Sequence, residues 1–156
     1  MGEPNYWGMS LAARQIGIQL ELRANEALSE EELTAPQAQV LLYILDRGEL
    51  GTSLTELQGV IGYSKGTLSA VVKRLRQMGY VRCEPCAEDD RRKRLFATEK
   101  SWRAGPGLRE AFRRAEERCY RGLSPEELLA LEQLQQKVLR NLNKNAPNGG
   151  KEGTQP

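Results

Sequence analysis

The chain contains no histidine, and this absence removes the commonest general base and the commonest metal ligand in proteins. A Ser-His-Asp or Cys-His nucleophile therefore cannot be assembled within it. Its three cysteines fall short of the four ligands that a closed structural zinc site takes. No glycine-rich segment has the spacing of a phosphate-binding loop or of a dinucleotide-binding turn. We therefore predict a protein that is not an enzyme and that uses neither a metal nor another cofactor.

Long apolar runs are also missing, since no stretch approaches the roughly 18 uninterrupted apolar residues that a membrane span needs. The N-terminus lacks the basic start and the apolar run of a signal peptide. Three cysteines, an odd number, argue against a disulfide framework. These features predict a soluble, cytoplasmic protein with reduced thiols. Its 156 residues, 39% of them apolar, suit one domain of ordinary size.

Positive charge is concentrated in one segment of a chain whose formal net charge is only +2. Between Ser64 and Arg94, nine basic residues outnumber four acidic ones, a local charge of +5 that leaves −3 for the remainder. Such clustering is typical of a surface that binds a polyanion. A solvated charge run on a helix and a loop has the same composition, so composition alone does not choose between the two.

The residues around this charge predict two short helices with a tight turn between them. Ser53 is placed to cap the first helix, and Glu56 to complete a capping box with it. Gly62 can supply the left-handed turn that ends this helix, and Ser64 can cap the second one. Two helices joined in this way form a helix-turn-helix motif, here over about residues 53–77.

The second helix separates apolar residues from small and cationic ones. Its predicted core stripe is Leu68, Val71, Val72, Leu75 and Met78. On the other side, small residues allow close approach to bases, and hydroxyl groups and lysines can bind base edges or phosphates. The DNA-binding candidates on this helix are Ser64, Lys65, Gly66, Thr67, Ser69 and Lys73. Alternatively, the glycine and serines there are only weak helix formers on a solvated face.

After this helix the sequence changes from helical to alternating periodicity. YVRCE and RLFAT predict two short strands joined by the loop PCAEDDRRK, so that a β-hairpin occupies about residues 80–98. A hairpin directly after a helix-turn-helix is a wing. Its predicted tip carries Arg91, Arg92 and Lys93, long cations suited to a minor groove or its phosphates.

Helices on either side of this lobe carry more apolar surface than their own segments can cover. A first helix, predicted from Leu11 to Leu28, has apolar residues on more than one face, and a further apolar stripe runs from Leu108 to Cys119. A last helix opens with Ser124 as its cap and presents a row of leucines. A two-fold dimer would bury this surface, although an intramolecular core explains it equally well.

Two further segments interrupt the regular pattern. Gly105-Pro106-Gly107 is expected to break or kink the helix that follows the hairpin. Residues 143–156 have too few apolar side chains to fold, and we predict a disordered tail there.

In this order and spacing, the segments resemble the MarR-type (multiple antibiotic resistance regulator) winged-helix transcription factors. The resemblance runs over about residues 10–142. It is carried by LTAPQAQVLLYIL, by the helix-turn-helix segment, by the wing signature DDRRKRLFATEKS and by GLSPEELLALEQLQQKVLRNL. It implies a mainly α fold in which a small β-hairpin wing completes a winged helix-turn-helix lobe, with N- and C-terminal dimerisation helices.

The resemblance also implies a function. The chain is expected to be a homodimeric, ligand-responsive repressor that binds an inverted-repeat operator in double-stranded DNA. Asp89 would hold Arg91 by a charge-assisted hydrogen bond, so that the guanidinium is oriented for the minor groove. With a one-residue slip, Asp90 and Arg92 would serve in their place. A turn-forming role of the aspartates is compatible with this arrangement.

Two other functions stay open on the sequence. The basic face could instead dock an acidic protein, which would make the chain a winged-helix protein-protein interaction module. Cys83 and Cys86, at the base of the wing, could make it a thiol-based redox sensor, because a disulfide or adduct there would distort the hairpin. Buried or incidental thiols are the favoured explanation of these cysteines.

Overall fold

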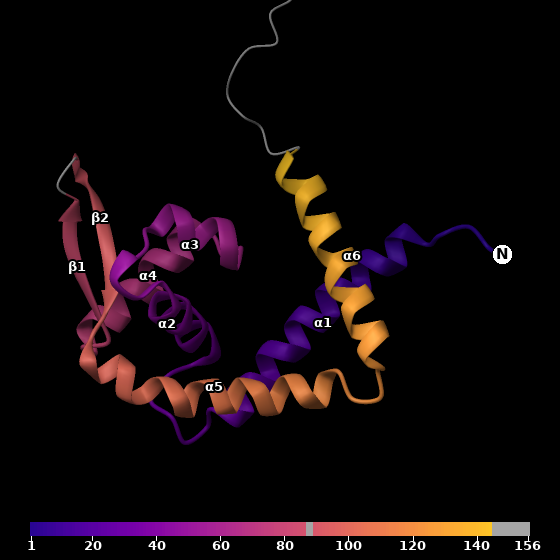
Figure 1. The fold of residues 1–156 in the computed structure, drawn as a ribbon, viewed down its shortest axis with the longest axis horizontal. Helices are drawn as coiled ribbons and strands as arrows, with labels where there is room; N and C mark the ends of the chain where they lie inside the picture. Colours follow the sequence, from indigo (N-terminus) through magenta and orange to yellow (C-terminus); the bar gives the residue numbers. More distant parts are fainter. Residues whose placement is uncertain (87–88, 145–156) are drawn as a thin grey trace, which may run out of the picture. The chain divides into compact units, whose positions relative to one another are not determined.

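The computed structural model describes residues 1–86 and 89–144, and the side chains of residues 86–92 and 144 lie outside that description. The chain divides into two units, residues 1–119 and residues 120–156 (Figure 1). The elements of the first unit are α1 (Tyr6–Ala27), α2 (Ala35–Arg47), the 3-10 turn η1 (Gly48–Leu50), α3 (Leu54–Ile61), α4 (Lys65–Gln77), β1 (Val81–Cys86), β2 (Asp89–Ala97) and α5 (Glu99–Cys119). The second unit contains α6 (Pro125–Lys144). A mainly helical fold with one small hairpin confirms the predicted fold class.

The core of the first unit is built around α2. This helix contacts α1, α3, α4, α5 and β2, and its Val40, Leu41 and Ile44 side chains are completely buried. Its N-terminus is capped because the Gln37 side chain accepts a hydrogen bond from the backbone N–H of Thr34 at 3.0 Å. Figure 1 shows α5 running from the base of the hairpin past α2 to α1. Helices α2 and α5 therefore form the support on which the smaller elements are arranged.

The predicted helix-turn-helix is confirmed. Ser53 Oγ accepts a hydrogen bond from the third backbone N–H of α3 at 3.2 Å. Gly62 ends that helix with a φ of 84°, the left-handed conformation that glycine adopts without a steric penalty. Ser64 Oγ then caps α4 by accepting from the N–H of Thr67, also at 3.2 Å. Local capping residues thus position both helices.

The capping box predicted at Ser53 forms only in part, because the Glu56 carboxylate binds elsewhere. It accepts a hydrogen bond from the hydroxyl of Thr52 at 2.9 Å. Thr52 is completely buried and exchanges two backbone hydrogen bonds with Leu95 of β2, at 3.0 and 2.7 Å. A buried hydroxyl without a partner costs free energy. Glu56 therefore stabilises the fold more by accepting the hydrogen bond of Thr52 than by accepting one from the backbone N–H of Ser53.

The predicted wing is confirmed, but its strands are longer and its connection shorter than the sequence indicated. β1 and β2 pair antiparallel from Val81 opposite Ala97 to Pro85 opposite Lys93, with an irregularity between Pro85 and Cys86. Residues 85–86 and 89–93, predicted to be loop, therefore belong to strands. Pro85 is tolerated because β1 is an edge strand, where not every backbone N–H has to bond to a neighbour.

The flanking helices differ from the predictions at two points. α1 begins at Tyr6 rather than at Leu11, because Asn5 Oδ1 caps it by accepting from the Gly8 N–H at 2.9 Å. α5 is one helix through Gly105–Gly107, so the break does not occur where a break or a kink was expected. Proline removes one helical hydrogen bond, and packing of α5 on α1 and α2 offsets that loss.

Gly105, the residue before Pro106, contributes to the packing of α5 on α2. A Cβ at Gly105 would lie 3.1 Å from Leu45 Cδ1 of α2, so the absence of a side chain lets the two helices approach closely. Cys119, predicted to extend the buried stripe of α5, is instead exposed at the end of the helix.

The last helix begins as predicted. Ser124 Oγ accepts from the Glu127 N–H at 3.1 Å, and the Glu127 carboxylate accepts from the Ser124 N–H at 2.9 Å. α6 extends to Lys144, two residues into the predicted tail, and residues 145–156 of that tail lie outside the described residues. The apolar side chains of α6 that are exposed include Leu129, Leu134, Val138, Leu139 and Leu142.

Within residues 1–86 and 89–144, no helix is both long and apolar enough to cross a bilayer.

Gly51 gives a test of how tightly β2 packs against the segment before α3. Its φ is +63°, and a Cβ there would lie 2.7 Å from Phe96 Cε1 and 2.8 Å from the Leu95 carbonyl oxygen. We expect Gly51→Ala to lower the free energy of unfolding by about 2 kcal/mol or more, measured by urea denaturation. Gly59→Ala in α3, where a Cβ meets open space, is the control and should be neutral or stabilising by up to ~1 kcal/mol. Equal effects of the two substitutions would contradict this packing.

Candidate nucleic-acid interface

The candidate residues predicted on the second helix of the motif all lie on the exposed side of α4. Leu68, Val72 and Leu75 are buried against the core, and Val71 and Met78 are half-buried beside them. The opposite side presents Ser64, Lys65, Gly66, Thr67, Ser69 and Lys73, all exposed. The helix therefore has one face that holds it to the protein and one face open to a partner.

Two of these candidates are engaged with each other at the start of α4. Ser64 Oγ accepts the backbone N–H of Thr67 and donates its own proton to Thr67 Oγ1 at 2.9 Å. Ser64 is thus first a capping residue. Gly66 has no protein atom within 4 Å of the position that a Cβ would occupy, so the fold does not require a glycine there.

A groove of about 620 Å³ lies between the start of α3, the exposed side of α4 and the hairpin. The charged side chains that line it are Glu56, Lys65, Lys73, Arg76 and Lys93. Four cations and one carboxylate give the groove a net positive charge, as a site for an anionic chain requires.

Arg76 was not among the residues singled out from the sequence. It lies one helical turn beyond Lys73, three residues on, and this spacing places both on the same side of α4. The spacing alone was a sufficient signal. The residues predicted from the sequence to bind DNA were chosen because they lie in the first turns of the helix, where side chains reach bases most easily.

Two of the nine basic residues of the run bind other groups of the protein. Arg82 forms an ion pair with Glu84 and lies over the ring of Phe96, 4.6 Å from its centroid. Arg94 donates hydrogen bonds to backbone carbonyl groups at the end of η1. Among the residues that the structure describes, Lys65, Lys73 and Arg76 form no ion pair.

Part of the predicted wing site lies beyond the described side chains. The backbone of Asp89, Arg91 and Arg92 belongs to β2, but their side chains lie outside the description. Lys93 is the first wing-tip candidate whose side chain is described, and it is exposed. The orienting bond from Asp89 to Arg91 stays a prediction.

The Glu56 carboxylate is ionised within the groove. The hydrogen bond from Thr52, followed by the nearby positive charge of Arg94, lowers its pKa from the ordinary value of 4.5. Since a lowered pKa favours the charged form, Glu56 carries its negative charge at neutral pH.

The end of α4 is held to the start of α5 by a cluster of polar contacts. The Tyr80 hydroxyl donates to Glu32 at 2.7 Å, and burial together with this carboxylate raises the pKa of Tyr80 to about 12. Lys100 Nζ donates to the Met78 carbonyl at 2.7 Å and lies 4.3 Å from the centre of the Tyr80 ring. Buried Ser101 donates to the Tyr80 carbonyl. These contacts fix the point where α4 turns into the hairpin.

The cysteines do not form a metal site or a disulfide among the described residues. Cys83 is half-buried, lines the groove and carries a free thiol, while the side chain of Cys86 lies outside the description. In the described ranges, no group of three or more cysteine, aspartate or glutamate side chains could hold a metal ion.

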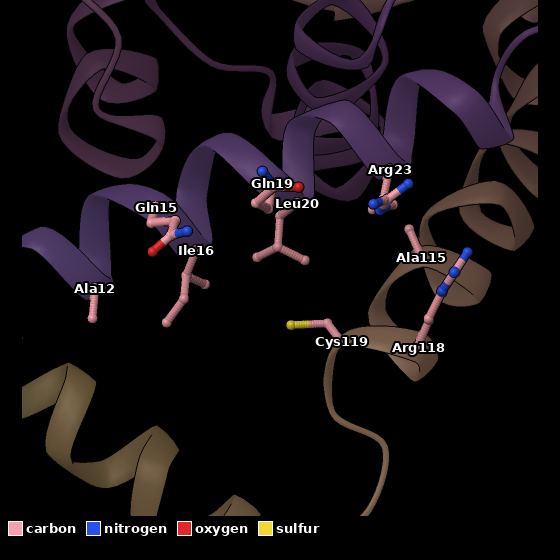
Figure 2. A pocket seen from close by; sticks show the side chains of 9 residues that line it. All are labelled: Ala12, Gln15, Ile16, Gln19, Leu20, Arg23, Ala115, Arg118 and Cys119. Atoms are coloured by element: carbon pink, nitrogen blue, oxygen red, sulfur yellow. The ribbon is translucent and has the colours of Figure 1, made fainter.

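Two further cavities lie in the first unit. One of about 360 Å³ lies between α1 and α5, where Ile16, Leu20 and Cys119 point into a common space (Figure 2). Another of about 750 Å³ lies between α2, α3 and α5, and its lining combines apolar side chains such as Leu42 and Phe112 with charged ones. Both are large enough for a small organic molecule or part of one.

The central segment of the chain is similar in sequence to known proteins. Residues 32–92 match the sequence model of the MarR family. Over 82 residues the chain is 37% identical to the HTH-type transcriptional regulator TtmR of Methylorubrum extorquens (strain PA1). This alignment covers 53% of the chain and 39% of the relative, so the chain spans about two fifths of that protein's length.

Solved structures extend the similarity of fold to most of the chain. The transcriptional regulator SlyA matches with a TM-score of 0.79 at 21% identity, over 88% of this chain and 95% of SlyA. MepR of S. aureus in complex with DNA gives 0.75 at 21% identity, over 89% and 99%. A mutant MarR of E. coli with operator DNA gives 0.74 at 23% identity, over 85% and 94%. Residues 32–92 are therefore similar to the MarR family, and most of the chain shares the winged-helix fold of these solved structures.

Proposed function

We propose that the chain is a transcriptional regulator that binds double-stranded DNA through α4 and the hairpin. The observation that carries this proposal is the cationic groove between these two elements, bordered by the exposed side of α4. Two proteins of similar fold, MepR and MarR, are described in complexes with DNA. We assign this function to residues 10–142.

In this proposal the groove receives the sugar-phosphate backbone. Lys65, Lys73 and Arg76 of α4 face it from one side and Lys93 of β2 from the other. Because these α4 cations form no ion pair with another described side chain, they can neutralise phosphates without first breaking a bond within the protein. Release of counterions from the DNA would then drive association.

Sequence would be read by the first turns of α4. Gly66 offers close approach, since no packing contact occupies its surroundings, and the exposed Ser69 hydroxyl can donate to or accept from a base edge. The aligned N–H groups at the start of the helix add partial positive charge toward the DNA.

A homodimer would explain the apolar surface that the chain leaves exposed. In α1, the side chains of Ile16, Ile18 and Leu22 are each about half exposed, and the leucines of α6 are similarly accessible. Apolar surface of this extent marks an interaction site in a soluble protein. A second copy is the simplest partner, because a two-fold axis would also place two α4 helices on the two halves of an inverted repeat.

Regulation by a small molecule is the finer part of the proposal. The cavity between α2, α3 and α5 adjoins the end of α3, so a ligand held there would press on the element that packs against α4. A ligand that binds better to the DNA-free arrangement would lower operator affinity and release a repressed gene.

The first test is the salt dependence of DNA binding, measured by gel shift or fluorescence anisotropy with random duplex DNA. With about six to ten phosphates neutralised by a dimer, log affinity should fall by ~0.9 per phosphate for each unit of log salt. Between about 50 and 200 mM salt, this amounts to a loss of about a thousandfold or more. A flat salt response would end the DNA-binding proposal and leave an acidic protein as the partner to seek.

The second test concerns symmetry. DNA selected from a random library should contain an inverted repeat with half-sites centred about one helical turn, ~10 bp, apart. Sedimentation should give a dimer in the absence of DNA. A monomer that protects a single asymmetric half-site in footprinting would refute the two-fold arrangement.

The third test separates reading from positioning on the selected operator. If Ser69 binds a base edge, Ser69→Ala should cost ~1–3 kcal/mol on the operator and barely change binding to random DNA. Lys93→Ala should weaken binding to both by a similar factor and reduce the salt slope, as loss of a phosphate contact does. Identical profiles for the two variants would contradict the division of roles between Ser69 and Lys93.

A further inference from the structure

Arg94 makes an unusual set of contacts for a cation in a run that faces a polyanion. Its Nε and Nη2 atoms donate to the Leu50 carbonyl at 3.0 and 2.8 Å, and Nη2 also donates to the Gly51 carbonyl at 3.0 Å. Nη1 lies 3.5 Å from Glu56 Oε1. About one third of the side chain is exposed, 32%. The donors of the guanidinium are thus directed into the protein.

All of these acceptors belong to one short segment, residues 50–56, which runs from the end of η1 into the first turn of α3. The planar guanidinium fork is suited to this task because it presents several donors in fixed directions. A lysine ammonium carries the same charge but offers no such fork. The contacts therefore depend on the shape of the arginine as well as on its charge.

The two residues that follow Arg94 reinforce the same junction. Leu95 exchanges two backbone hydrogen bonds with Thr52, and the Phe96 ring is packed so closely on Gly51 that a Cβ there would clash with it. Three successive residues of β2 are thus bound to the segment that leads into the helix-turn-helix. Leu95 binds this segment through its backbone and Phe96 through its ring. Arg94 binds it through polar side-chain contacts at the edge of the groove.

The junction determines where the groove walls stand. Lys93 immediately precedes Arg94 on β2 and lines the groove, as do Leu95 and Glu56. A shift of β2 relative to residues 50–56 would move Lys93 relative to the cations of α4. The spacing between the two cationic walls therefore depends on the contacts of residues 94–96 with residues 50–56, and Arg94 supplies the polar side-chain contacts among them.

We infer that Arg94 is a positioning residue, which holds the wing in register with α4 so that both contact the DNA backbone, and is not itself a phosphate ligand. The inference rests on the proposed DNA-binding function. It gives one of the nine cations of the basic run a task inside the protein.

The experiment compares Arg94→Gln, Arg94→Lys and the matched control Lys93→Gln in the full chain. Lys93 is the adjacent cation on the same strand and lies exposed. In the free protein, we expect both Arg94 variants to speed hydrogen exchange of the Thr52 and Leu95 amides, because these amides form the adjoining pair of hydrogen bonds. Lys93→Gln should leave their exchange unchanged.

On DNA, both Arg94 variants should lose affinity for the selected operator by about tenfold, which corresponds to ~1.4 kcal/mol. The lysine variant is decisive, since a phosphate ligand would keep most of its affinity when its charge is kept. Lys93→Gln should lower affinity and the salt slope without any effect on exchange.

Three results would overturn the inference. The first is wild-type affinity for Arg94→Lys; the second is loss of affinity with unchanged amide exchange, which would mark a direct DNA contact. The third is faster exchange with unchanged affinity, which would mark a residue that serves stability alone. If the wild-type protein shows no salt-dependent DNA binding, the proposed function fails instead, and the exchange measurement still reports whether Arg94 holds the junction.

Discussion

The pairing of Thr52 with Leu95 is the interaction on which the functional part of this molecule depends. A hairpin of two strands is only marginally stable by itself in water, and here it gains a third partner through two backbone hydrogen bonds to a buried residue. The Thr52 hydroxyl recruits Glu56 from α3, and Glu56 in turn lies beside Arg94 of β2. Wing and helix-turn-helix are thereby joined through one short segment.

The cations of the basic run have different partners. Arg82 and Arg94 bind within the protein, where Glu84 and Glu56 compensate their charges. Lys65, Lys73, Arg76 and Lys93 line the open groove. Because exposed ion pairs contribute little to stability, the role of Arg94 lies in the geometry that its hydrogen bonds impose on the strand. In the proposed function, the cations that line the groove would then bind the DNA backbone without a change in the spacing between α4 and the hairpin.

The two units have opposite packing characters. The first has a continuous core around α2, whereas α6 of the second leaves its leucines exposed. Among the described residues, Ile16, Ile18 and Leu22 of α1 are exposed in the same way. This surface is why a homodimer forms part of the proposed function.

Local chemistry made much of this protein predictable from its sequence. Capping serines, the left-handed Gly62 and the change from helical to alternating periodicity act over a few residues, so they located α3, α4, the hairpin and the exposed side of α4. Interactions between distant segments decided the rest. Burial of Thr52 redirected Glu56, packing on α2 kept α5 helical through Pro106, and carbonyl groups more than 40 residues away turned Arg94 inward. No local pattern carries such information, because a side chain's partner is chosen by which segments the fold brings within hydrogen-bonding distance.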